Sequence, residues 1–138
     1  APLQINHVSP KIILEDNANG PDRFNMDSNL SSLTGTISQD SESPAGFSKS
    51  FKVDLTGITG AMGATEYISI RQKIEAQNLQ HLQNGTSGAV STTLSFWVRS
   101  SITGTYGVRI RKEDNTAREI TGTYAISAAD TWESSICW

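Results

Sequence analysis

Seven side chains in three stretches of the chain have the chemistry of a binding surface. In each stretch they alternate with apolar residues, so they would lie on the outward faces of three strands. The residues are Tyr67, Arg71, Lys73, Trp97, Arg99, Arg109 and Arg111. Planar rings stack on the faces of sugars, and guanidinium groups bind carboxylates or hydroxyls. If the three strands share one sheet, the sequence predicts a basic, aromatic face suited to an acidic surface glycan.

A purely structural interpretation of the same residues stays open. Exposed cations are common on strands, and Lys or Arg at a sheet edge also hinders aggregation. In that interpretation a loop or a neighbouring subunit covers Trp97. Binding measurements on a Trp97→Ala variant separate the two hypotheses.

A cluster of oxygen-bearing side chains in the N-terminal part of the chain is a candidate calcium site. Its members are Glu15, Asp16, Asn17, Asn19 and Asp22. Calcium takes about six to eight oxygen ligands and tolerates flexible loops. The spacing differs from that of an EF-hand, and clusters of Asn, Asp and Gly also form ordinary turns. Either a structural calcium ion or plain turn chemistry accounts for this segment.

No pattern typical of catalysis is present in the sequence. His7 and His81 lie far apart and have no Cys or carboxylate pattern of a zinc site near them. There is no Ser/His/Asp order, nucleophile elbow or phosphate loop, and the spacing of the glutamates does not favour a glycosidase pair. The single cysteine, Cys137, carries no motif. We therefore expect a protein that is not an enzyme and requires no cofactor.

Length and charge restrict the class of protein further. The chain has 138 residues and a net charge of −3, from 11 basic and 14 acidic residues. This charge argues against a nucleic-acid binder that relies on bulk electrostatics. No apolar run is long enough to cross a membrane, and no signal-peptide pattern opens the chain. We expect neither nucleic-acid binding nor membrane insertion.

The elements that must position the candidate residues are short strands. Apolar and polar residues alternate in segments at roughly ten-residue spacing, separated by turn-forming residues. Short strands could form at residues 1–5 and 11–14, and further strands are expected at residues 34–38, 48–56, 66–75, 91–100, 105–113, 118–126 and 131–138. Residues 76–90 show one or two helical turns that end at Asn84-Gly85. This pattern predicts an all-β protein with two antiparallel sheets packed as a sandwich.

The alternation also predicts which side chains face the core. In the strand at residues 66–75, Ile68, Ile70 and Ile74 would lie on the buried face. Phe96 and Trp132 are expected to anchor the core of the later strands.

Several ordered strings carry a resemblance to a known family. They are PDRF (21–24), SPAGFSKSFKV (43–53), RQKIEAQNLQHLQNGT (71–86), LSFWVRSSITGTY (94–106) and SAADTWE (127–133). With their gaps they resemble a β-sandwich module of bacteriophage tail-fibre and other virion structural proteins. That module is similar to family 4/9-type carbohydrate-binding modules, which share a jelly-roll, galactose-binding-like fold. The resemblance spans residues 21–133.

Two departures from the module affect the expected domain organisation. The module continues past the Trp-Glu pair with a further strand, whereas this chain stops at Trp138, and the opening before Asp22 differs. We expect a single jelly-roll domain over residues 1–138, with residues 1–20 as an N-terminal arm or edge strands. The chain would be part of a longer virion protein, or else a compact relative of the module.

The resemblance implies a non-catalytic structural domain of a phage particle, associated with the tail or a fibre. Such a domain would be made in the bacterial cytoplasm and displayed on the virion, where it binds host-surface carbohydrate or docks onto neighbouring virion proteins and onto itself as a homo-oligomer. The alternatives are a capsid decoration or assembly protein, and a carbohydrate-binding module of a secreted bacterial enzyme. One fold hosts many functions, so the site residues must decide.

Overall fold

The computed structural model describes residues 12–13, 23–30, 33–57, 62–112 and 118–137. Within this part of the chain the elements are strands and one short 3-10 helix. The chain divides into two compact units, Ala1–Ala76 and Gln77–Trp138. Each unit is built from antiparallel strand pairs, so the prediction of an all-β protein is confirmed.

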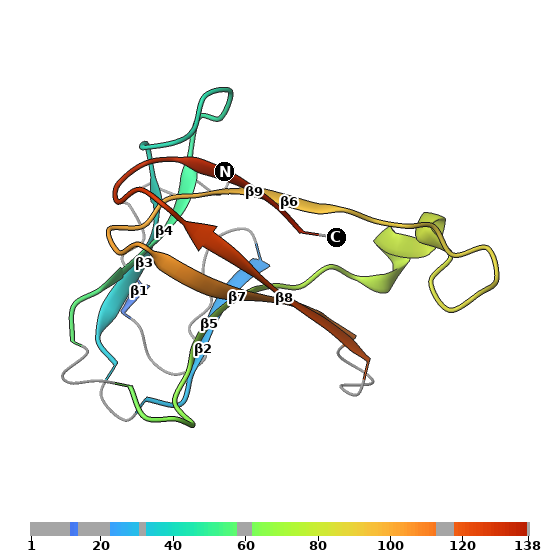
Figure 1. Cartoon of the computed structure of the whole chain (residues 1–138), viewed down its shortest axis with the longest axis horizontal. Helices are drawn as coiled ribbons and strands as arrows, with labels where there is room; N and C mark the ends of the chain where they lie inside the picture. Colours follow the sequence, from blue (N-terminus) through green and yellow to red (C-terminus); the bar gives the residue numbers. More distant parts are fainter. Residues whose placement is uncertain (1–11, 14–22, 31–32, 58–61, 113–117, 138) are drawn as a thin grey trace, which may run out of the picture. The chain divides into compact units, whose positions relative to one another are not determined.

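The first unit contains two antiparallel sheets (Figure 1). One has the strand order β1-β3-β4, formed by β1 (Ile12–Ile13), β3 (Gly35–Asp40) and β4 (Ser50–Leu55). The other pairs β2 (Phe24–Ser28) with β5 (Ile68–Gln72). In the order of the sequence, β3 and β4 therefore come between β2 and β5, the two strands that pair in the other sheet.

The core of the first unit forms where apolar faces of these two sheets meet. Met26 on β2 and Ile37 on β3 are both 0% exposed. Half-buried apolar side chains pack against them, namely Leu33, Phe51, Val53 and Ile68. Phe24 stacks on Phe51, with ring centroids 4.6 Å apart. Side chains alternate across a strand, so the neighbour of Met26, Asp27, lies on the opposite face of β2.

The second unit repeats this nested arrangement of strands. It contains most of the 3-10 helix η2 (Ala76–Leu82), followed by β6 (Leu94–Val98), β7 (Gly104–Arg111), β8 (Glu119–Ile126) and β9 (Glu133–Cys137). β7 pairs with β8, and β6 pairs with β9, all antiparallel. Figure 1 shows β6 beside β9 and β7 beside β8.

Three aromatic rings hold the two strand pairs of the second unit together. Tyr124 on β8 meets Phe96 on β6 edge to face, with centroids 5.0 Å apart, and stacks on Tyr106 of β7 at 5.7 Å. Such ring pairs contribute about 0.5–1.5 kcal/mol each beyond the area that they bury. Ile126, 3% exposed, is the most buried apolar side chain described in this unit. Trp97 follows Phe96 and therefore lies on the outward face of β6.

Most of the predicted elements are confirmed, with bounds that differ by a few residues. The strands expected at 34–38, 48–56 and 118–126 correspond to β3, β4 and β8. The helical turns expected after residue 76 form a 3-10 helix, but the helix ends at Leu82, before the expected stop at Asn84-Gly85. Gln83, with a φ of 50°, takes the left-handed conformation that ends the helix. Strand β2, in contrast, was not predicted.

The predicted burial along β5 is wrong in part. Ile68 packs against the core, but Ile70 is 52% exposed and does not belong to the core cluster. Ile74 is 56% exposed, because β5 ends at Gln72 and the alternation of the strand does not extend to it. The opposite face of β5, expected to face water, is instead partly covered.

Candidate functional site

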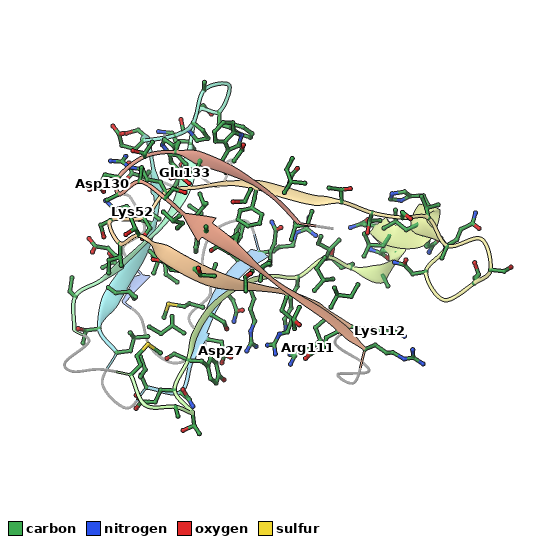
Figure 2. The ribbon with its side chains drawn as sticks, in the orientation of Figure 1. Asp27, Lys52, Arg111, Lys112, Asp130 and Glu133 are labelled. Carbon is green, nitrogen blue, oxygen red and sulfur yellow. The ribbon has the colours of Figure 1, made fainter. Side chains whose placement is uncertain are left out.

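A buried aspartate organises the polar face of the β2–β5 sheet. Asp27, which is labelled in Figure 2, is 8% exposed and forms an ion pair with Arg71. The hydroxyl of Tyr67 donates a hydrogen bond of 3.0 Å to the same carboxylate. Arg71 Nε donates to Ser69 Oγ at 3.2 Å, and Ser69 donates to the Asp27 carbonyl at 3.3 Å. Two of the seven predicted binding residues, Tyr67 and Arg71, are thus held by an internal network.

This network changes the interpretation of Tyr67 and Arg71. A buried carboxylate without a partner costs several kcal/mol, about 3–5 in measured cases. Arg71 and Tyr67 remove that cost by pairing with Asp27. Their polar groups therefore serve the fold of the first unit, although Tyr67 is 42% exposed and the side chain of Arg71 is 29% exposed. Asp27 itself was missed from the sequence, because nothing near it indicated burial.

The side-chain amide of Asn29 closes the end of the same sheet. Its Nδ2 donates to the Thr65 carbonyl at 2.8 Å, and its Oδ1 accepts the Tyr67 amide at 2.7 Å. The backbone amide of Asn29 in turn donates a hydrogen bond to the Tyr67 backbone carbonyl at 3.3 Å. The backbone of Tyr67 is therefore fixed beside β2, which sets the position of its ring.

Trp97 is the most accessible of the predicted aromatic residues in the second unit. It is 45% exposed on the outward face of β6, and its cross-strand partner on β9 is Ser134. The residue directly opposite Trp97, Ser134, and the residue two positions before it, Ser95, both have small side chains. Ile136, which pairs with Ser95, is 75% exposed on the same face. We call these four residues the Trp97 face. An exposed ring flanked by hydroxyls and one aliphatic group can stack on a sugar or on an apolar side chain.

A charged corner lies next to the Trp97 face. Arg99 lies just after β6, two residues beyond Trp97, and by the alternation of the strand it points to the same side as Trp97. Its guanidinium lies 4.0 Å from the Asp130 carboxylate. The Glu133 carboxylate accepts hydrogen bonds from the amides of Ser127, at 3.0 Å, and Ala128, at 2.7 Å (Figure 2). These bonds fix the turn between β8 and β9, and with it the position of Asp130. The corner presents the guanidinium of Arg99, which follows β6, and the carboxylate of Asp130 on the β8–β9 turn, an arrangement that can bind polar groups.

The remaining predicted cations lie outside the β6–β9 strand pair that carries the Trp97 face. Arg109 and Arg111 lie on the β7–β8 pair, where Arg109 is 3.6 Å from Glu119. Lys73 follows β5 in the first unit and is exposed. The single shared sheet that the sequence prediction required is absent from the described ladders, which place β5, β6 and β7 in three different strand pairs.

The described residues hold no cluster of three or more metal-binding side chains of the His, Cys, Asp or Glu type. The candidate calcium ligands at positions 15, 16, 17, 19 and 22 lie outside the described residues. None of the helices within the described ranges has the length and apolar character needed to cross a bilayer.

Two contacts define the environment of the Asp40 carboxylate. It accepts the Glu42 amide at 3.0 Å and pairs with Lys52 at 3.2 Å. The Glu42 amide and then the Lys52 ammonium hold the pKa of Asp40 below its ordinary value of 3.8. Because the folded pKa lies below the unfolded one, ionised Asp40 stabilises the fold above pH 3.8, and this contribution is lost as the pH falls through the folded pKa.

We expect an NMR titration of the Asp40 carboxyl carbon to give a midpoint below 3.8. In Lys52→Met the midpoint rises but stays below that value, because the Glu42 amide remains. A wild-type midpoint at or above 3.8 would contradict the described contacts.

Comparisons of this chain with protein-family models, with curated proteins and with solved structures find no match.

Proposed function

We propose that this chain is a non-catalytic jelly-roll domain of a phage virion, tail or fibre associated, that binds host-surface carbohydrate through the Trp97 face. The antiparallel pairing of every described strand supports the sandwich part of this proposal. The resemblance of residues 21–133 to virion β-sandwich modules supports the phage setting. No catalytic group is assigned, and the domain would act by adhesion alone.

The exposed ring of Trp97 is the observation that carries the binding proposal. A tryptophan that is 45% exposed on a regular strand, with serine as its cross-strand partner, has a flat accessible surface. Sugars present flat patches of C–H groups that stack on such rings, and their hydroxyls can bond to Ser95, Ser134 or Arg99. Arg99 adds a positive group that favours acidic glycans.

We expect Trp97→Ala to lower the affinity for a bound glycan at least roughly tenfold, because the lost stacking and buried area contribute about 1.5 kcal/mol or more. A glycan array identifies the ligand, and isothermal titration calorimetry measures the affinity. Phe47→Ala is the matched control, since Phe47 is 58% exposed in the first unit and lies outside the Trp97 face. Equal binding by wild-type and Trp97→Ala would remove the proposal.

Docking to a neighbouring virion protein is the second candidate function, and Ile136 favours it. An isoleucine that is 75% exposed beside a tryptophan is more typical of a protein contact than of a sugar site. In this case Ile136→Ser lowers copurification of the domain with virus particles, whereas glycan binding is absent in both proteins. Symmetric homo-oligomers on the particle would fit the same interpretation.

A further inference from the structure

The turn at Asn84-Gly85 combines the features of a spontaneous chemical modification site. The Thr86 amide donates to the Gln83 carbonyl at 3.2 Å, so residues 83–86 form a tight turn with Asn84 and Gly85 at its centre. Both central residues are exposed. Gly85 has a φ of 89°, and apart from Gly85 and its two chain neighbours no heavy atom lies within 4 Å of the place where a Cβ would stand. The space beside the Gly85 Cα is therefore open, and no Cβ stands beside its backbone nitrogen.

The chemistry that these groups support is an intramolecular acyl transfer. The Gly85 backbone nitrogen, after loss of its proton to water or hydroxide, attacks the side-chain carbonyl carbon of Asn84. The new C–N bond closes a five-membered succinimide, and the side-chain amide leaves as ammonia. Water then opens the ring at either carbonyl and gives aspartate or isoaspartate. Nucleophile and carbonyl belong to adjacent residues, so their effective concentration is high.

Other asparagines in the described part of the chain lack this combination. Asn29 precedes Leu30, and both ends of its amide are held by hydrogen bonds to the backbone at residues 65 and 67. Asn78 lies inside the 3-10 helix η2 and precedes Leu79, whose side chain hinders the attacking nitrogen. Asn25 lies within strand β2. The chain's other Asn-Gly pair, Asn19-Gly20, lies outside the described residues.

We propose that Asn84 is a site of spontaneous deamidation, which converts the exposed turn after η2 into an aspartate or isoaspartate turn. The product gains one negative charge, which takes the net charge of the chain from −3 to −4. The isoaspartate form also adds one carbon to the backbone between Gln83 and Thr86, the two residues that close the turn.

Incubation of the purified full chain in neutral and in mildly alkaline buffer tests the proposal. Trypsin then releases the peptide of residues 74–99, which contains both Asn78 and Asn84. Mass spectrometry with electron-transfer fragmentation locates the deamidated residue and separates isoaspartate from aspartate. We expect conversion at Asn84 that increases with time and with pH, with isoaspartate present, while Asn78 on the same peptide stays largely unchanged.

Two variants make the result specific to the Asn-Gly pair. Gly85→Ala should slow the conversion roughly tenfold, because a Cβ restricts both φ and the approach of the nitrogen. Asn84→Gln keeps Gly85 and its turn but needs a six-membered ring, so its peptide should show no comparable conversion at position 84. Conversion at Asn84 no faster than at Asn78, or unchanged by Gly85→Ala, would overturn the proposal.

Discussion

A Met26→Ala variant is expected to lose about 3 kcal/mol in the free energy of unfolding, within the range of about 2–5 kcal/mol measured for such core truncations. Met26 is 0% exposed and forms the centre of the first unit together with Ile37. The truncation removes apolar contacts with both sheets and leaves a cavity between them. Whole domains have only about 5–15 kcal/mol of stability, so this loss would be a large fraction of the total.

The other methionine of the chain provides a matched control for Met26. Met62 is 45% exposed, and Met62→Ala should change the stability by no more than about 0.5 kcal/mol. Urea denaturation followed by circular dichroism measures both variants, with an unchanged slope as evidence that only stability has changed. Equal midpoints for the two variants would show that Met26 is not at the centre of a packed core.

An Asp27→Asn variant is expected to cost about 3 kcal/mol, although it removes only one charge and almost no volume. The change leaves the Arg71 guanidinium without its counter-ion in a partly buried position, and breaking such pairs costs about 3–5 kcal/mol. The side chain of Arg71 is 29% exposed, so water screens part of the loss and the lower end applies. Urea denaturation again measures the effect.

The control for Asp27 is an aspartate on the neighbouring sheet. Asp54 lies on β4 and is exposed, and Asp54→Asn should stay within about 0.5 kcal/mol of wild type. Combining Asp27→Asn with Arg71→Met removes both charges and should recover part of the lost stability, which a double-mutant cycle quantifies. Additive losses would show that the two side chains do not interact.

The same short strand explains why sequence reasoning failed where it did. Met26 and Asp27 both belong to β2, whose sequence FNMDS contains no β-branched residue and three residues that favour turns. Local propensity therefore gave no strand signal. The strand forms because Met26 is buried on one face and Asp27 is paired with Arg71 on the other, and both partners come from distant parts of the chain. A pattern of residues that are neighbours in the sequence cannot indicate such tertiary contacts.

Of the residues that form the Trp97 face and the charged corner, the sequence analysis named only Trp97 and Arg99. Alternation correctly placed Phe96 inside and Trp97 outside on β6. Which strands pair with one another depends on contacts between segments far apart in sequence, so the alternation of each strand could not place Trp97, Arg71 and Arg109 relative to one another. The ladders put them in separate strand pairs, and the ion pair with Asp27 gives Arg71 a structural role.

The pairing of β6 with β9 has a consequence for the order in which the second unit folds. β7 and β8 are adjacent in the chain and can meet after closing one short loop, whereas β6 and β9 flank that entire hairpin. Loop-closure entropy makes distant pairings slower to form than adjacent ones. We therefore expect the β7–β8 hairpin to form first and to bring Leu94–Val98 and Glu133–Cys137 close enough to pair. We therefore expect β6, the strand that carries Trp97, to pair with β9 after the hairpin has formed, so that the Trp97 face is completed late in folding.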